Sequence, residues 1–345
     1  MNPFASYRAI NTKLHAKRRI LLSDAEWIKI AQCKNVGQIV EFLKKREGYK
    51  SLMTVYNTND LHRSELEIVL DRYLVNEIED MLHYFSGNYK EFFKTLLMEY
   101  EIHDLGLILR SITSNEDMTD IESLFVHSKK WERVNYQKLI ACKNVLQFIE
   151  GLKGSSYYMA LKTMTQEDLA KREFHMEMKL YMLFYSELTQ KATRLNKKDE
   201  AIAKRLIGTK IDFLNTQWIY RAIKYYDISP EEILIYSLPN GNRLDYRKLK
   251  TLSYAKDVET FKKLVEKYLS YPLFKDNRDA YLDCNTERYL YRLATRINKD
   301  DESIAASISY IYILGIEVND LVSLTEGIRY AVPETELSRF LVHTI

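Results

Sequence analysis

The chain has 345 residues, which is long for a single compact core and suits two or three domains. Its 51 lysines and arginines nearly balance its 48 aspartates and glutamates, leaving a formal net charge of +3. This balance argues against a nucleic-acid-binding protein, which usually carries a concentrated basic excess, although it does not exclude a small basic patch. Five prolines and ten glycines are too few for the turns of a long β-protein, so we expect an all-α fold.

Cysteine usage and hydropathy point to a soluble protein of a reducing compartment. The three cysteines, Cys33, Cys142 and Cys284, are widely spaced and form no CxxC pair. The N-terminal residues lack the apolar core of a signal peptide. The longest apolar stretch, from Ile304 to Ile316, is shorter than the roughly 18 residues of a membrane span. We therefore expect a soluble chain that could still lie beside a membrane.

Local signals predict where several helices begin and end. Ser23-Asp24-Ala25-Glu26 is a capping box, which places a helix start at Ser23. Ser229-Pro230-Glu231-Glu232 combines an N-cap serine, a proline at the first helical position and acids in the first turn. Apolar residues recur at helical spacing in two segments, Leu66-Val69-Leu70-Tyr73-Leu74 and Ile207-Ile211-Leu214-Trp218. Breaks are expected at Ser114-Asn115-Glu116-Asp117 and at the turn Leu238-Pro239-Asn240-Gly241-Asn242.

A first marker occurs three times along the chain. Its copies are Cys33-Lys34-Asn35-Val36, Cys142-Lys143-Asn144-Val145 and the looser Ala255-Lys256-Asp257-Val258. Thirteen residues after each valine stands a tyrosine, at Tyr49, Tyr158 and Tyr271, followed three residues later by Leu52, Leu161 or Phe274.

Two further markers follow in the same order. The second consists of Glu67-x-x-Leu70, Glu177-x-x-Leu180 and Glu287-x-x-Leu290. The third consists of Glu101-Ile102-His103-Asp104, Asp212-Phe213-Leu214-Asn215 and Glu317-Val318-Asn319-Asp320, each with an apolar residue four positions on, at Ile108, Ile219 and Leu324. Arg110 and Arg221 are equivalent, whereas the third copy has Glu326. A period near 110 residues exceeds the 20–50 of a solenoid, so each copy is predicted to be a helical bundle with its own core.

The sequence predicts no catalytic, cofactor-binding or metal-binding residue. It contains no GxxxxGK[ST] loop, no GxGxxG and no HExxH or HxxxH pair. Cys33 and Cys142 stand beside apolar helical positions and are expected to be small core residues rather than thiolate ligands. The glutamates of the second marker could be acid catalysts, but their triplication favours a cap, an ion pair or a helix contact.

Two groups of residues, the basic run near the N-terminus and the tyrosines, each have two possible interpretations. The run Lys13, Lys17, Arg18 and Arg19 is expected to be a solvated helix face, with contact to acidic lipid or an acidic partner as the alternative. Some of the 26 tyrosines are expected to line bundle cores with hydroxyls that reach water, with a tyrosine-rich binding surface as the alternative.

The whole arrangement resembles the C subunits of V-type/A-type ATPases (ATP synthases), a family whose eukaryotic relative is called the d subunit. The resemblance covers essentially the whole chain and rests on the triplication together with several segments. These are Tyr7-Arg8-Ala9 to Leu21-Leu22-Ser23, the Lys-Asn-Val to tyrosine element of each repeat, Ile211-Asp212-Phe213-Leu214-Asn215 with Tyr220-Arg221-Ala222, and Ile228-Ser229-Pro230-Glu231-Glu232 with Leu238-Pro239-Asn240-Gly241. The third repeat departs most, with Ala255 for cysteine and Glu326 for arginine.

The resemblance implies three similar helical bundles around a pseudo-threefold axis, in a funnel, which we assign to residues 1–115, 116–228 and 229–345. It also implies a non-catalytic central-stalk rotor subunit. Such a subunit links the axle to the membrane rotor ring, peripheral to the cytoplasmic face of the membrane, and transmits torque for proton or sodium transport. The implied partners are the axle subunits and the ring, with no nucleic acid, small-molecule substrate or cofactor. We expect polar and tyrosine side chains of all three units to line the socket for the axle.

Two other functions stay open from the sequence. The chain could be a helical scaffold or adaptor unrelated to rotary ATPases. It could also be an all-α enzyme with a site in the central cavity, which clustered acids with strongly shifted pKa values in one pocket would favour.

Overall fold

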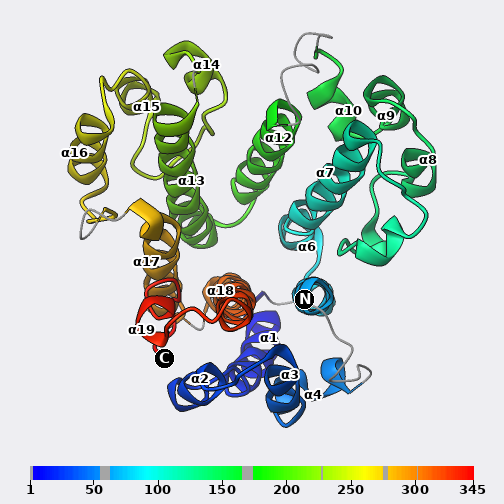
Figure 1. The fold of residues 1–345 in the computed structure, drawn as a ribbon, viewed down its shortest axis with the longest axis vertical. Coiled ribbons are helices and arrows are strands. Elements are labelled where there is room, and N and C mark those ends of the chain that lie inside the picture. Colours follow the sequence, from blue (N-terminus) through cyan, green and yellow to red (C-terminus); the bar gives the residue numbers. More distant parts are fainter. Residues whose placement is uncertain (1–2, 55–62, 165–173, 227, 275–278, 301) are drawn as a thin grey trace.

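A computed structural model describes residues 3–54, 63–164, 174–226, 228–274, 279–300 and 302–345 (Figure 1). Every regular element within these ranges is a helix, so the predicted all-α class is confirmed. The first helices are α1 (Pro3–Arg18), α2 (Asp24–Ala31), α3 (Val36–Lys44), α4 (Glu47–Met53), α5 (Arg63–Leu82), α6 (Gly87–Thr95) and α7 (Met98–Ser114). They are followed by η1 (Ile121–Leu124), η2 (Lys129–Trp131), α8 (Tyr136–Ile140), α9 (Val145–Gly151), α10 (Ser156–Leu161), α12 (Phe174–Ala192) and α13 (Lys197–Tyr225). The last are α14 (Pro230–Ile235), α15 (Tyr246–Ser253), α16 (Val258–Leu269), η4 (Asp279–Tyr281), α17 (Leu282–Ile297), α18 (Ala305–Arg329) and α19 (Glu334–Leu337).

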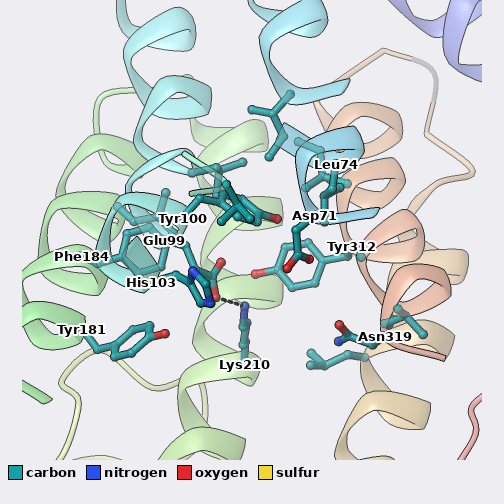
Figure 2. A pocket seen from close by; sticks show the side chains of 18 of the residues that line it. Asp71, Leu74, Glu99, Tyr100, His103, Tyr181, Phe184, Lys210, Tyr312 and Asn319 are labelled. Atoms are coloured by element: carbon teal, nitrogen blue, oxygen red, sulfur yellow. Dashed lines mark hydrogen bonds and ion pairs between the residues drawn. The ribbon is translucent and has the colours of Figure 1, made fainter. Parts of the chain in front are cut away.

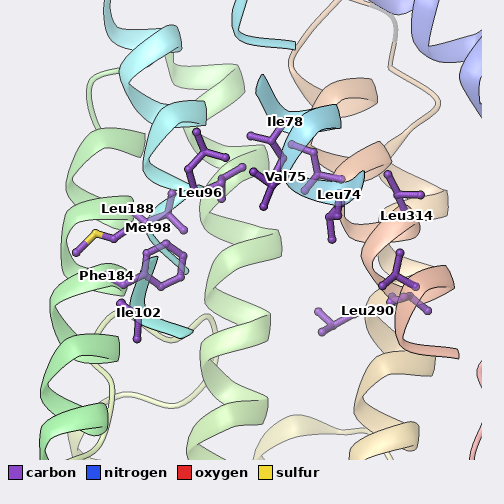
Figure 3. Close-up of a cluster of buried hydrophobic side chains, with 14 of the residues drawn as sticks. Leu74, Val75, Ile78, Leu96, Met98, Ile102, Phe184, Leu188, Leu290 and Leu314 are labelled. Carbon is purple, nitrogen blue, oxygen red and sulfur yellow. The ribbon is translucent and has the colours of Figure 1, made fainter. Parts of the chain in front are cut away.

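Long and short helices occupy different places in the molecule. Figure 1 shows the long helices α7, α12, α13, α17 and α18 around the middle, and the short groups α2–α4, α8–α10 and α14–α16 on the outside. Apolar side chains of the long helices face one another in the interior, as Figure 3 shows for Val75 on α5, Leu188 on α12, Leu290 on α17 and Leu314 on α18. The centre of the fold is therefore built from helices that are distant in sequence.

The predicted helix starts and breaks are confirmed. Ser23 is the N-cap of α2, and its backbone N–H donates to Oε2 of Glu26 at 2.8 Å, as in a capping box. Ser229 is the N-cap of α14, with Pro230 at the first helical position. Helix α7 ends at Ser114, where the C-cap Asn115 adopts the left-handed conformation.

The first marker has one physical role in all three copies, because its third residue caps a helix. Asn35, Asn144 and Asp257 are the N-caps of α3, α9 and α16. Their side-chain oxygens accept hydrogen bonds from backbone N–H groups three residues later, at 2.9, 2.9 and 2.7 Å. The triplicated pattern is thus a helix-start signal, which tolerates either asparagine or aspartate.

Buried acids of the third marker hold the backbone of an outer segment against each of the helices α7, α13 and α18. Glu101 on α7 accepts the backbone N–H of Arg133 at 2.8 Å, and Glu317 on α18 accepts that of Leu22 at 3.0 Å. On α13, Asp212 accepts the N–H of Arg243 at 2.8 Å. Burial raises the pKa of these anchoring acids, to about 6 for Asp212 and to about 7 for Glu317, against the effect of their hydrogen bonds.

A second anchor lies three residues further along each of these helices. Asp104 accepts the backbone N–H of Val126 at 2.9 Å, and Asp320 accepts that of Val342 at 2.9 Å. Asn215 fills the same position on α13 and exchanges two hydrogen bonds with the backbone of Leu238, at 2.7 and 2.8 Å. An amide can replace the acid here because it supplies both a donor and an acceptor.

The two ends of the chain together form the outer segment that packs on α18. Leu22 comes from the N-terminal end and Val342 from the C-terminal end, and Figure 1 shows the C-terminus beside α2. Trp27 stacks on His343 with ring centroids 4.5 Å apart. On α7 the corresponding segment is continuous, and there Tyr136 stacks on His127 at 3.8 Å.

One tyrosine of the first marker was assigned to the wrong position. The hydroxyl of the fully buried Tyr49 donates to Glu317 at 2.5 Å. The residue that makes the same bond to Glu101, at 2.6 Å, is Tyr157, one residue before the Tyr158 that the spacing pairs with Tyr49. Helix α9 has seven residues where α3 has nine, so the spacing from valine to the buried tyrosine differs between the copies.

Helix α18 is long and apolar enough to cross a membrane by length and composition alone. However, 78% of its most apolar window is buried inside the protein, where the helix contacts α1, α5 and α17. The apolar stretch predicted at Ile304 to Ile316 therefore belongs to a core helix.

Candidate functional site

A pocket of about 270 Å³ lies among the long helices at the centre of the fold (Figure 2). Its walls come from α5, α7, α12, α13, α17 and α18. Apolar residues such as Leu74 and Phe184 form part of the lining, together with a set of charged and phenolic side chains. We take this pocket as the candidate site because it gathers polar groups from several helices.

One ion pair bridges α7 and α13 inside the pocket. Oε1 of Glu99 lies 2.9 Å from Nζ of Lys210, and both side chains are about one-third exposed or less. Burial alone would lower the pKa of Lys210, but Glu99 and the nearby phenols raise it well above its ordinary value. Lys210 is therefore a permanent cation whose charge is already matched by Glu99.

Asp71 on α5 and Glu287 on α17 are two acids of the pocket that have no ion-pair partner among the described residues. In the part of the chain that the structure describes, neither carboxylate forms an ion pair with lysine, arginine or histidine. Burial raises the pKa of Asp71 to about 6, opposed by the charge of His103. Burial also raises the pKa of Glu287 to about 7, opposed by a 2.9 Å hydrogen bond from Asn319. Both groups take up protons near neutrality, far above the ordinary range of carboxyl groups.

Acidic residues of the central pocket also line a second pocket of about 470 Å³, which lies among α5, α17 and α18. The two pockets share Asp71, Glu287 and Asn319, and the second also contains Glu67 and Asp283. Asp283 is paired at the surface with Arg221 at 2.7 Å. The mutual repulsion of these acids contributes to the raised pKa values of Asp71 and Glu287.

Tyrosines supply much of the remaining polar surface. Tyr100, Tyr181, Tyr185 and Tyr312 line the pocket, and burial raises the pKa of each phenol. Tyr185 is 1% exposed, and its hydroxyl has no hydrogen-bond partner among the described residues. A buried phenol without a partner is rare, because the lost hydrogen bonds cost free energy.

Two histidines that share the carboxylate of Asp104 lie beside the pocket on α7. His103 lines the pocket and its Nδ1 lies 3.0 Å from Oδ1 of Asp104, whose other oxygen lies 2.7 Å from Nδ1 of His127. The hydrogen bond with Asp104 raises the pKa of His103 despite partial burial. The charge of His103 is therefore drawn mainly toward Asp104 and not toward Asp71.

These features partly match what was expected of an enzyme, since two acids with raised pKa values share one pocket. However, the described lining of the central pocket contains no cysteine, serine or threonine that could act as a nucleophile. Cys284 lies in the second pocket, where burial raises the pKa of its thiol to about 12, so the thiol stays neutral. The charged and phenolic groups of the lining can take up protons and can bind a charged or hydrogen-bonding group.

The glutamates of the second marker all line pockets. Glu67 lines the second pocket, Glu287 lines both, and Glu177 lies in a small pocket beside α7 with Gly106 and Arg110. Their leucines, Leu70, Leu180 and Leu290, are buried in the core. The contact seen for Glu287, with Asn319 on α18, is a helix contact of the kind predicted from triplication.

Two residues of the basic run on α1, Lys17 and Arg18, do not lie on the solvated face that we expected, whereas Arg19 is exposed and Lys13 is half-buried. Lys17 pairs with the buried Glu77 on α5, and its side chain is 18% exposed. Burial lowers the pKa of Arg18 to about 10, and Nε and Nη2 of its guanidinium have no hydrogen-bond partner in the described structure. Side-chain spacing alone could not reveal that α1 packs against α18 and turns these cations inward.

The cysteines and many of the tyrosines belong to the core. Cys142 is buried and Cys33 is half-buried, both as free thiols. No group of three or more histidine, cysteine, aspartate or glutamate side chains within the described ranges could hold a metal ion. Several core tyrosines donate to buried acids and not to water as predicted, for example Tyr7 to Asp199 at 2.6 Å and Tyr310 to Glu77 at 2.8 Å.

Sequence reasoning missed Asp71, Glu99, Lys210 and Tyr185. A signal was present, because Glu99, Lys210 and Gly315 each stand two residues before an anchoring acid of the third marker. These three positions all face the central pocket. A charged residue at a fixed offset from a triplicated core marker could have identified the pocket lining.

Comparison with known proteins relates the chain to one family. A family described as "ATP synthase (C/AC39) subunit" matches residues 10–340. The C subunit of the A-type ATP synthase of Pyrococcus abyssi is 22% identical over 348 residues, which cover 98% of this chain and 90% of that protein. Those of Archaeoglobus fulgidus and Methanosarcina acetivorans are each 24% identical, over 72% and 75% of this chain and 72% and 70% of their own lengths.

Proposed function

This chain belongs to the ATP synthase (C/AC39) subunit family, and we propose that it is a non-catalytic central-stalk rotor subunit of a V/A-type rotary ATPase. In this role it links the axle subunits to the membrane rotor ring and transmits torque between them. The observation that carries the proposal is the family match over residues 10–340, together with relatives that are C subunits of A-type ATP synthases. The chain would be peripheral to the membrane, bound through the ring at the cytoplasmic face.

We further propose three similar helical bundles in a pseudo-threefold, funnel-shaped arrangement, with boundaries at residues 1–115, 116–228 and 229–345. The recurring N-caps Asn35, Asn144 and Asp257 support this division. So do the anchoring acids Glu101 and Glu317, whose equivalent on α13 is Asp212. The segments of the two chain ends on α18 give that helix an outer segment like those on α7 and α13, which supports a ring of three bundles.

The central pocket is the part of the fold best suited to receive a side chain of the axle. Side chains of α5, α7, α12, α13, α17 and α18 meet there, so an axle side chain bound in it would contact all three proposed bundles. Contacts spread over several helices transmit torque without straining any single one. The buried hydrogen bonds that tie each outer segment to its long helix supply the rigidity that torque transmission needs.

A pull-down with the isolated axle subunits tests the proposal. The full chain is immobilised and challenged with the axle, in the presence and in the absence of the rotor ring. Capture of the axle supports the rotor role, and no binding under either condition contradicts it. Purification of the chain from its native membrane distinguishes the scaffold alternative, in which the ATPase subunits would not accompany it.

An all-α enzyme remains the second candidate because of the raised pKa values of Asp71 and Glu287. In the rotor role these acids serve binding, and their replacement would change axle affinity. In the enzyme role the same replacement would abolish turnover of a small molecule and leave axle capture unchanged.

A further inference from the structure

The central pocket holds an excess of negative charge. Glu99 and Lys210 neutralise each other, whereas Asp71 and Glu287 face the same space with no cation paired to either within the described structure. Figure 2 shows Asp71 from α5 and Asn319 from α18 directed toward the region that Lys210 and Glu99 occupy. A group that fills this space should therefore carry a positive charge, because the pocket lacks one.

Charged and polar groups face the two acids from several helices. The charges that act on Asp71 are those of His103, Glu67, Asp104 and Glu99. Glu287 accepts a hydrogen bond from Asn319 and interacts electrostatically with Asp320, Asp283 and Lys210. Most of these neighbours are acidic, Lys210 is held by Glu99, and His103 is held by Asp104. The surroundings thus make the deficit of positive charge larger, not smaller.

Tyr185 supplies an independent sign that the pocket takes a ligand. Tyr185 lines the pocket, and its buried hydroxyl is acted on by the charges of Lys210 and Glu99 but lacks any partner among the described residues. A phenol oxygen can accept a hydrogen bond from an ammonium or guanidinium group. The pocket therefore presents carboxylates for the charge of a cation, and an unused acceptor lies in its wall.

The size of the pocket limits the occupant to a small group. About 270 Å³ equals the volume of roughly nine water molecules, enough for the end of one long side chain but not for a helix. Gly315 on α18 contributes to this space, since a Cβ there would meet only Leu74, at an ordinary 3.5 Å.

We infer that the central pocket binds a cationic group, an ammonium or a guanidinium, between Asp71 and Glu287, and that the axle supplies it as a lysine or arginine side chain. The inference rests on the proposed function for the source of the cation but not for its chemistry. A bound cation favours the ionised carboxylates, so binding releases protons and becomes tighter as the pH rises through 6 to 7.

The test compares three variants of the full chain by calorimetric titration with isolated axle subunits at pH 8. Asp71→Asn combined with Glu287→Gln neutralises the pocket. Gly315→Leu fills the pocket without changing its charge. Glu116→Gln combined with Asp120→Asn is the matched control, because it removes two exposed acids outside the pocket.

The expected result is at least a tenfold loss of axle affinity in both pocket variants and none in the control. The wild-type affinity should also fall between pH 8 and pH 5.5, and that of the neutralised variant should not. Thermal unfolding of each variant verifies that it is folded. If a folded neutralised variant binds the axle as tightly as the wild type does, the axle does not supply the cation.

Titration with agmatine, which carries a free guanidinium and an ammonium, separates the two sources of the cation. Binding of agmatine that depends on Asp71 and Glu287, with unchanged axle binding, assigns the site to a free organic cation. If neither agmatine nor the axle responds to the pocket variants, the inference is wrong. If the wild-type chain binds no axle at any pH while agmatine binds, the rotor proposal fails and the cation site stands.

Discussion

The imidazole of His343 stacks on the indole of Trp27, with ring centroids 4.5 Å apart and planes 12° from parallel. Trp27 is completely buried, and Nδ1 of His343 lies 2.7 Å from Asp320 on α18. This contact joins the second helix of the chain to its third-last residue. It holds together two segments that are distant in the sequence.

We predict that Trp27→Ala opens this junction. Removal of a fully buried tryptophan should cost about 3–5 kcal/mol of unfolding free energy. It should also release the end of the chain, because His343 loses the ring on which it stacks. Hydrogen exchange at the backbone N–H groups of Val342 and His343, which donate to Asp320, measures that release directly.

Tyr136→Ala is the matched control for this prediction, since Tyr136 stacks on His127 in a continuous segment. It should destabilise the protein and speed exchange at Val126 and His127, but leave the amides of Val342 and His343 protected. Unchanged protection of those two amides in Trp27→Ala would refute the closing role of Trp27.

A second prediction concerns the buried bond from Tyr49 to Glu317. Tyr49→Phe removes one of the two hydrogen bonds that the structure gives this carboxyl, at a cost of about 1.5–3 kcal/mol when the group is ionised. Because the pKa of Glu317 is about 7, the carboxyl is mostly ionised at pH 8 and mostly protonated at pH 6. The loss of stability in urea should therefore be larger at pH 8 than at pH 6.

Tyr157→Phe should destabilise the protein in the same way through Glu101, whereas Tyr158→Phe should cost less than about 0.5 kcal/mol. A larger effect at Tyr158 than at Tyr157 would restore the tyrosine assignment made from the sequence.

The sequence predicted those features of the fold that depend on local chemistry. The N-caps at Ser23 and Ser229 and the helical spacing of Leu66 to Leu74 follow from side chains close together in the chain, and the structure confirms them. The third marker was recognised as a repeat, but its function as a backbone anchor was not, because the partners lie 22 to 295 residues away.

The features that sequence analysis missed depend on packing between distant helices. Lys17 and Arg18 have the spacing of an exposed face, yet α1 packs against α18 and these two side chains are partly buried. Asp71 and Glu287 come from helices more than 200 residues apart, so no local pattern joins them. The resemblance to a family suggested a socket, and only the folded structure identified the acids inside it.

A third prediction follows from the raised pKa of Glu287. Its carboxyl has an ordinary pKa near 4.5 in the unfolded chain and about 7 in the folded protein, so the folded state binds the extra proton between these values. Glu287 therefore lowers stability as the pH rises from 4.5 to 7, and its penalty is complete above 7. Glu287→Gln should raise the melting temperature at pH 8 by about 2 °C and change it little at pH 4.5.

Thermal unfolding of the wild type and the variant at both pH values checks this prediction. Glu116→Gln serves as the control, because Glu116 is exposed and the same chemical change should leave the melting temperature unaltered at either pH. A Glu287→Gln variant that melts lower than the wild type at pH 8 would contradict a net cost of ionising this carboxyl.

The last prediction concerns the close approach of Gly241 to Asp212. A Cβ at position 241 would lie 2.2 Å from Oδ1 of Asp212 and 2.9 Å from the backbone oxygen of Leu244. Asp212 accepts the N–H groups of Arg243 and Leu244 at 2.8 and 3.0 Å, so a methyl group there must displace the loop from its anchor on α13. Gly241→Ala should therefore cost at least about 2 kcal/mol through overpacking and loss of these hydrogen bonds.

Gly106→Ala separates this steric effect from the general consequences of replacing glycine. Gly106 lies within α7, and a Cβ there would meet only the flexible end of Arg110, at 3.4 Å. Alanine should stabilise that helix by about 0.5–1 kcal/mol. Urea unfolding of both variants should thus give changes of opposite sign, because the same methyl group fills open space on α7 but collides with a buried acid on α13. Equal stability of Gly241→Ala and the wild type would mean that the loop is not held against Asp212.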